Sequence, residues 1–215
     1  MYEIIVLGAT FLAAGIARER EKDCLILESR LRAGDEFCGS LCACYGAERK
    51  LYPHLARADV RFGTRVVSVE KTETGFTCLT HGPDGFAAFE GRRVIDTRVS
   101  PRMCQSKTFN FLMESEEKPA FPGAPAEPAA MENHYVVRLP IPLDWDYSRA
   151  RLKALEVVGA FSGEQKLLLT ADEFDYRVKP GYPREEGGIF CLPSKGYASP
   201  ELAFAAGILA GKGVL

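Results

Sequence analysis

A glycine and a glutamate near the start of the chain have the spacing of a nucleotide-binding turn and its ribose-binding acid. Gly8 follows the apolar run of residues 2–7 and precedes residues 11–20, which have helical spacing of apolar side chains. Glu28 stands 20 residues after Gly8, at the end of a second apolar run over residues 24–27. An acid at this offset can bind the hydroxyls of an adenosine ribose, and its charge disfavours a 2′-phosphate.

The turn itself, Gly8-Ala9-Thr10-Phe11-Leu12-Ala13, keeps one of the three glycines of the usual dinucleotide fingerprint. Those glycines allow the tight turn, the close approach of the pyrophosphate, and the packing of the helix on the strand. Thr10 stands at the second position, where we expect its β-branched side chain to occupy space that a phosphate would use. A single glycine also suits an ordinary βα turn, so Glu28 and the order of the elements carry the interpretation.

The elements around this pair predict a parallel sheet with an inserted meander. Strand, turn, helix and strand in this order are typical of a βαβ unit. Residues 60–90 then alternate in polarity around the turn at residues 82–85, which predicts a three-stranded antiparallel meander. Residues 94–96 and 187–192 predict buried strands, and residues 200–212 predict a helix of small side chains.

The middle of the chain differs in character and predicts a second, smaller region. We expect strands at residues 108–113, 134–139 and 166–170. We expect a helix at residues 148–158. We therefore expect residues 1–100 and 186–215 to form a dinucleotide-binding domain. We expect residues 101–185 to form a small α+β subdomain of the substrate or cap type.

Composition and charge narrow the classes of partner. Hydrophobic residues make up 47% and charged residues 26% of the chain, as in a soluble globular protein, and the net charge of −2 offers no positive field for nucleic acid or an anionic membrane. The apolar run of residues 4–17 lacks a basic leader and is shorter than the roughly 20 residues that span a bilayer. We expect a cytoplasmic protein with reduced thiols, a small-molecule substrate and possible homo-oligomers.

Three cysteines, Cys38, Cys42 and Cys44, fall in the loop after the second strand. Their spacing matches no recognised set of zinc ligands, and none of the histidines completes one. We expect them to form no disulfide and to hold no metal.

Three segments resemble FAD-dependent oxidoreductases of the glutathione-reductase type, and they occur in the order of that family. They are residues 2–37, residues 60–97, which end in Val94-Ile95-Asp96-Thr97, and residues 187–213, which include Gly196-Tyr197-Ala198-Ser199-Pro200. The resemblance implies an α/β fold: an FAD/NAD(P)-binding Rossmann-like parallel sheet with helices on one side and an antiparallel β-meander on the other, plus the small α+β subdomain.

The resemblance also implies FAD as the cofactor. Its pyrophosphate would lie at the helix that begins at Phe11, its ribose at Glu28, its adenine beside the backbone at Val67, and its flavin before the helix that begins at Pro200. It assigns no catalytic residue and no metal. The positions that it assigns to the cofactor are Gly8, Ala9, Thr10, Phe11, Leu12, Glu28, Ser29, Val67, Thr97, Ser194, Ser199, Pro200 and Glu201.

Three functions stay open at this point. The first is an FAD-dependent oxidoreductase acting on an unknown small molecule. The second is a flavin-fold binding or interaction module that has lost the cofactor and catalysis. Thr10 favours this second function, and so does Pro193-Ser194, which stands where the family usually carries Gly-Asp. The third is an NAD-dependent enzyme, against which the meander counts. If FAD binds, we expect it to bind more weakly than in typical relatives.

Overall fold

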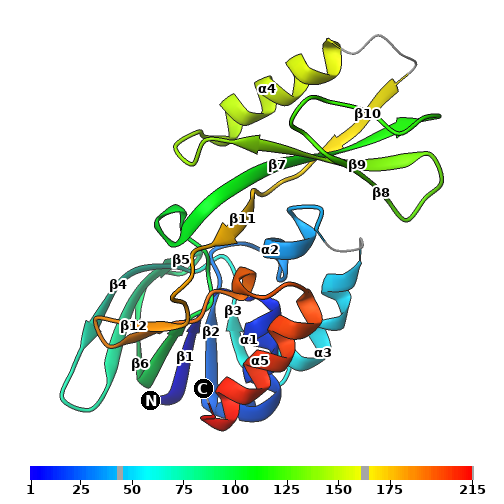
Figure 1. Cartoon of the computed structure of the whole chain (residues 1–215). Helices are drawn as coiled ribbons and strands as arrows, with labels where there is room; N and C mark the ends of the chain where they lie inside the picture. Colours follow the sequence, from blue (N-terminus) through cyan, green and yellow to red (C-terminus); the bar gives the residue numbers. More distant parts are fainter. Residues whose placement is uncertain (43–45, 161–164, 215) are drawn as a thin grey trace. The chain divides into compact units, whose positions relative to one another are not determined.

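The computed structural model describes residues 1–42, 46–160 and 165–214 (Figure 1). These residues form two compact units. Unit 1 comprises Met1–Asp35, Gly46–Val99 and Pro180–Leu215, and unit 2 comprises Glu36–Tyr45 and Ser100–Lys179. The units change between Val99 and Ser100 and between Lys179 and Pro180, and Glu36–Tyr45 groups with unit 2. The functional division into a dinucleotide-binding domain and a cap stays a prediction.

Unit 1 contains a parallel sheet in the order β13-β6-β1-β2-β3. Short β12 is antiparallel to β13 at the edge of this sheet. The predicted βαβ unit is present: strands β1 and β2 are parallel neighbours, and helix α1 (Phe11–Arg20) connects them. The bounds are Tyr2–Leu7 (β1), Cys24–Leu27 (β2), Asp59–Arg61 (β3), Gly85–Asp96 (β6), Arg184–Glu186 (β12) and Ile189–Cys191 (β13).

The antiparallel meander of β4 (Arg65–Lys71), β5 (Phe76–Gly82) and β6 is present as predicted. The separate strand expected at residues 94–96 is instead the end of β6. This strand of 12 residues pairs with β5 along its first part and with β1 along its second. One strand thus links the meander rigidly to the parallel sheet.

Both faces of the parallel sheet are buried. Ile5, Leu7 and Leu25 cluster with Phe76 and Cys78 of the meander. Because side chains alternate along a strand, Ile4, Val6 and Ile26 point to the opposite face, and each is completely buried. This explains why the strands read as continuous apolar runs.

Three helices of unit 1, α1 (Phe11–Arg20), α3 (Tyr52–Leu55) and α5 (Pro200–Lys212), lie together beside the sheet (Figure 1). Before β3, the chain forms a 3₁₀ turn, Ala47–Lys50, followed by short α3. Glycines set the closeness of α1 and α5: a Cβ on Gly207 would lie 2.0 Å from the carbonyl oxygen of Leu12, and one on Gly15 would lie 2.2 Å from that of Phe204.

Unit 2 is a five-stranded antiparallel sheet with one long helix, α4 (Tyr147–Gly159). The helix packs Ala150 and Ala154 against a core that includes Phe109 and Phe111. The α+β character predicted for this region is confirmed. Its strands are β7 (Cys104–Ser115), β8 (Ala126–Pro128), β9 (His134–Ile141), β10 (Gln165–Thr170) and β11 (Asp175–Val178); short α2 (Asp35–Cys38) begins at the last residue of unit 1. No helix among the described residues is long and apolar enough to cross a membrane.

The packing of α1 on α5 yields a stability prediction. We expect Gly207→Ala to lower the free energy of unfolding by about 1–3 kcal/mol, because the added methyl group forces two backbones apart. Gly196→Ala is the matched control in the same unit, since its Cβ would have only Pro193 nearby, at 3.9 Å. Urea titrations of both variants measure the difference, and equal stabilities would contradict this account of the helix pair.

Candidate dinucleotide-binding site

The turn at Gly8 can be made only by glycine. Gly8 has φ +97°, and a Cβ there would lie 2.6 Å from Cγ of Arg98 and 3.2 Å from Oγ1 of Thr97. Its N–H donates to the carbonyl oxygen of Leu27 at 2.9 Å, which ties the turn to the end of β2. The first glycine of the fingerprint therefore performs its expected conformational role.

Glu28 follows β2 directly, and its side chain faces the Gly8 turn. The N–H of Ala9 donates to Oε2 of Glu28 at 2.8 Å, and the N–H of Arg30 donates to Oε1 at 2.9 Å. Ser29 adds a longer hydroxyl contact to Oε1, at 3.3 Å. The placement predicted from the 20-residue offset is confirmed. A carboxylate has about four lone-pair positions, so Glu28 can still accept a hydrogen bond from a ligand hydroxyl.

Thr10 is the N-cap of α1 and is turned into the protein. Its Oγ1 accepts from the N–H of Ala13 at 3.1 Å and donates to Oγ1 of Thr97 at 2.9 Å. Thr97 in turn donates to the carbonyl oxygen of Leu7 at 2.9 Å. Only 6% of Thr10 is exposed. The expectation that its side chain projects into phosphate space is therefore wrong, because the hydroxyl is used to cap the helix and to join β6 to the turn.

Arg98 is a feature of this edge that the sequence analysis did not identify. Its guanidinium holds Asp96 in a fork, with Nε 2.9 Å from Oδ1 and Nη2 2.8 Å from Oδ2. The hydrogen bonds that the guanidinium donates to Asp96 raise the pKa of Arg98 above its ordinary value, and the charge of Glu28 raises it further. No motif in the sequence marks Arg98, which follows Thr97 just after the end of β6.

The expected adenine position, Val67, lies at a β-bulge in β4, where the register with β5 shifts between Val66 and Ser68. Its side chain is half-exposed at 53%. The strand begins just after Thr64, whose N–H donates to the backbone oxygen of Glu28 at 2.8 Å. The hydrogen bond at Thr64 therefore ties the backbone of Glu28 to the start of the strand that carries this bulge.

The residues assigned to the flavin end of the cofactor lie at the start of α5 and just before it, and most of them make contacts within the protein. Ser199 caps α5 by accepting from the N–H of Leu202 at 3.3 Å, and Pro200 is the first residue of the helix. Hydrogen bonds from its own N–H and from the Ser199 hydroxyl lower the pKa of Glu201, so this carboxylate already occupies the amino end of α5. Ser194 is fully buried, and its backbone N–H donates to the backbone oxygen of Thr97 at 2.9 Å.

These residues fit one half of FAD better than the other. The Gly8 turn, the amino end of α1 with its dipole, and the remaining lone pair of Glu28 suit an adenosine diphosphate. Phe11 and Leu12 are buried at the start of α1, so only their backbone could face a phosphate. At the flavin half, Glu201 and the buried Ser194 offer no equivalent provision.

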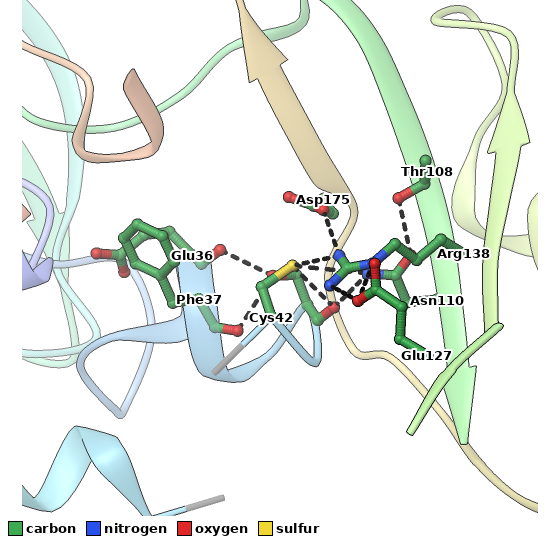
Figure 2. A network of polar contacts seen from close by, with 9 residues as sticks. Glu36, Phe37, Cys42, Thr108, Asn110, Glu127, Arg138 and Asp175 are labelled. Atoms are coloured by element: carbon green, nitrogen blue, oxygen red, sulfur yellow. Dashed lines mark hydrogen bonds and ion pairs between the residues drawn. The ribbon is translucent and has the colours of Figure 1, made fainter. Parts of the chain in front are cut away.

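A second polar cluster lies within unit 2, around Arg138 on β9. Figure 2 shows its guanidinium between Glu127, Asp175 and the sulfur of Cys42, with Nη2 2.8 Å from Glu127, and Nη1 3.2 Å from Asp175 and 3.4 Å from the sulfur. Two carboxylates, those of Glu127 and Asp175, thus share the Arg138 guanidinium with the sulfur of Cys42.

The same cluster explains why the segment after Glu36 groups with unit 2. The buried amide of Asn110 donates to the backbone oxygen of Ser40 at 2.7 Å and contacts the sulfur of Cys42 at 3.6 Å. Cys44 lies outside the described residues, so the prediction for the three cysteines stays a prediction. Among the described residues, no group of three or more His, Cys, Asp or Glu side chains is arranged to hold a metal ion.

No family model and no curated protein matches this chain. Solved structures do match. They include the p-nitrophenol 4-monooxygenase PnpA from Pseudomonas putida DLL-E4, with a TM-score of 0.62, 12% identity, and coverage of 99% of this chain and 77% of that one. OxyS anhydrotetracycline hydroxylase from Streptomyces rimosus matches with a TM-score of 0.63, 15% identity, and coverage of 98% and 61%.

A third match, the ternary complex of aklavinone-11 hydroxylase with FAD and aklavinone, has a TM-score of 0.61, 14% identity, and coverage of 98% and 61%. This chain therefore spans less than two thirds of the length of several matched proteins. At such identities the likeness shows the fold alone, which this chain shares with a monooxygenase and with hydroxylases, one of them solved with FAD. These matched structures are hydroxylases and a monooxygenase, so they support an FAD-binding type of fold but not specifically the glutathione-reductase type.

The role of Thr10 as a cap yields a second prediction. We expect Thr10→Val to lower the free energy of unfolding by about 1–3 kcal/mol, because it removes the N-cap bond and the bond to Thr97 while preserving shape. We expect Thr10→Ser, which keeps the hydroxyl, to retain most of the stability. Thr74→Val, at an exposed position, is the control for the substitution itself. A Thr10→Val variant as stable as the wild type would contradict the assignment.

Proposed function

We propose that unit 1 binds FAD through its adenosine diphosphate half, and that the chain is an FAD-dependent oxidoreductase acting on a small organic molecule. The observation that carries this proposal is the bond from the N–H of Ala9 to the carboxylate of Glu28, at 2.8 Å. It holds a ribose-binding acid and a glycine turn together in a fold that a solved FAD complex shares.

The proposal rests on preorganisation. Glu28 is fixed by two backbone N–H groups, so its carboxylate loses little conformational freedom when a ribose hydroxyl donates to it. Gly8 and Thr10 hold the start of α1 in place beside it, where the helix dipole favours an anion by about 0.3–1 kcal/mol. This chain's residues thus bind and orient the nucleotide, and the bound flavin would supply the hydride or electron chemistry.

The proposed substrate class comes from the matched proteins. The matched proteins include a p-nitrophenol 4-monooxygenase and an aklavinone hydroxylase, which favours an aromatic substrate. This chain spans only part of those proteins, so the inference to an aromatic substrate rests on the fold.

A binding module without redox activity is the second candidate, and the flavin-side residues favour it. Glu201 places a carboxylate at the amino end of α5, where its charge would oppose an anionic cofactor, and Ser194 is buried. Such a module would bind ADP as well as FAD and would show no substrate-dependent flavin reduction or reoxidation. An oxidoreductase would bind FAD more tightly than ADP.

Glu28 provides the direct test. We expect Glu28→Gln to weaken FAD binding about tenfold to a hundredfold, because it removes a hydrogen bond to a charged acceptor. Titration of flavin fluorescence measures the affinity, and the visible spectrum of the purified protein reports any cofactor that is retained. Glu73→Gln, an exposed position in the same unit, is the control. Equal affinities of the wild type and Glu28→Gln would refute the assignment of Glu28.

A further inference from the structure

We propose that Arg98 is the phosphate ligand of this site, with its guanidinium and the amino end of α1 together binding the pyrophosphate of an adenine dinucleotide. This inference rests on the proposed function and deepens it. It assigns the phosphate contact to a side chain, where the fingerprint of the family uses the close approach of a glycine backbone.

Three observations place Arg98 beside the turn. The register of the parallel sheet sets Asp96 opposite Leu7, so the residues that follow each strand emerge at the same edge. The Cγ of Arg98 lies 2.6 Å from the position that a Cβ on Gly8 would take. Thr97, between Asp96 and Arg98, is fully buried and bonded to the turn, so Arg98 extends from a rigid support.

Asp96 orients the Arg98 guanidinium but uses only some of its N–H donors. Asp96 accepts from Nε and Nη2 of Arg98, and also from its backbone N–H at 3.0 Å. A guanidinium has five N–H donors, so these bonds leave three for another anion. The side chain of Arg98 is 47% exposed, and that of Asp96 is only 15% exposed. The arginine therefore faces solvent across the turn, with the aspartate behind it.

Charge explains why this arginine matters here. Glu28 and Asp96 put two negative charges at the edge where a pyrophosphate would carry further negative charge. Arg98 forms an ion pair with Asp96 and also interacts favourably with the charge of Glu28. Arginine also binds phosphate oxygens with a planar pair of donors, which lysine cannot do. Without Arg98, two carboxylates would oppose the phosphates.

The opposite possibility is that the Arg98 side chain covers the Gly8 turn and hinders the nucleotide. The two possibilities predict opposite effects of removing Arg98. If Arg98 binds phosphate, its removal weakens the binding of ligands that carry phosphate and leaves adenosine binding unchanged. If Arg98 obstructs the turn, its removal strengthens the binding of both.

The experiment is calorimetric titration of the wild type, Arg98→Ala and Arg98→Lys with ADP and with adenosine. We expect Arg98→Ala to lower ADP affinity about tenfold to a hundredfold, the range for loss of a charge-assisted contact, and to change adenosine affinity by no more than about twofold. We expect Arg98→Lys to be intermediate. Arg92→Ala, at an arginine that is 61% exposed and paired with Glu3, controls for loss of one positive charge.

The outcomes separate this inference from the proposed function. If the wild type binds ADP and Arg98→Ala binds it equally or more tightly, the role of Arg98 is wrong and the nucleotide site stands. Equal loss of ADP and adenosine would show general damage to the turn and would also contradict phosphate recognition. A wild type that binds neither ADP, adenosine nor FAD would contradict both proposals.

Discussion

The hydrogen bond between the N–H of Ala9 and the carboxylate of Glu28 joins the two halves of the candidate site. Ala9 belongs to the turn after β1, and Glu28 follows β2, so the bond crosses from one parallel strand to the next. Every other feature of the edge depends on this juxtaposition. The positive φ of Gly8 brings Ala9 within reach, and the Thr10 cap fixes where α1 begins. The βαβ unit thus brings the Gly8 turn, the start of α1 and Glu28 together at one edge of the sheet.

The sequence predicted the elements of unit 1 because their signals are local or periodic. Gly8, the apolar strands and the helix of small residues at 200–212 each carry their own pattern, and α5 has the predicted bounds. The course of β6 was not predictable in this way. Its alternation in the meander and its buried end read as two strands, but Gly91 pairs with both Phe76 and Tyr2 within one continuous strand.

The parts of the site that sequence reasoning missed depend on side-chain direction and long-range pairing. From the sequence, a threonine at the second fingerprint position suggests a steric conflict with a phosphate. In the structure, its hydroxyl donates instead to Thr97, which is 87 residues away along the chain. Arg98 carries no motif, and only the register of β6 against β1 brings it to the Gly8 turn. The placement of Glu36 in unit 2 likewise follows from contacts such as that of Asn110 with Ser40.

The central claim is that nucleotide binding occurs at the Gly8 turn. Hydrogen–deuterium exchange with and without saturating FAD tests it without any substitution, because bound phosphates and ribose slow the exchange of the amides that they cover. The account predicts protection of peptides that contain residues 8–14, 28–30 and 96–99. Protection confined to other parts of the chain, or no protection at saturating FAD, would contradict it.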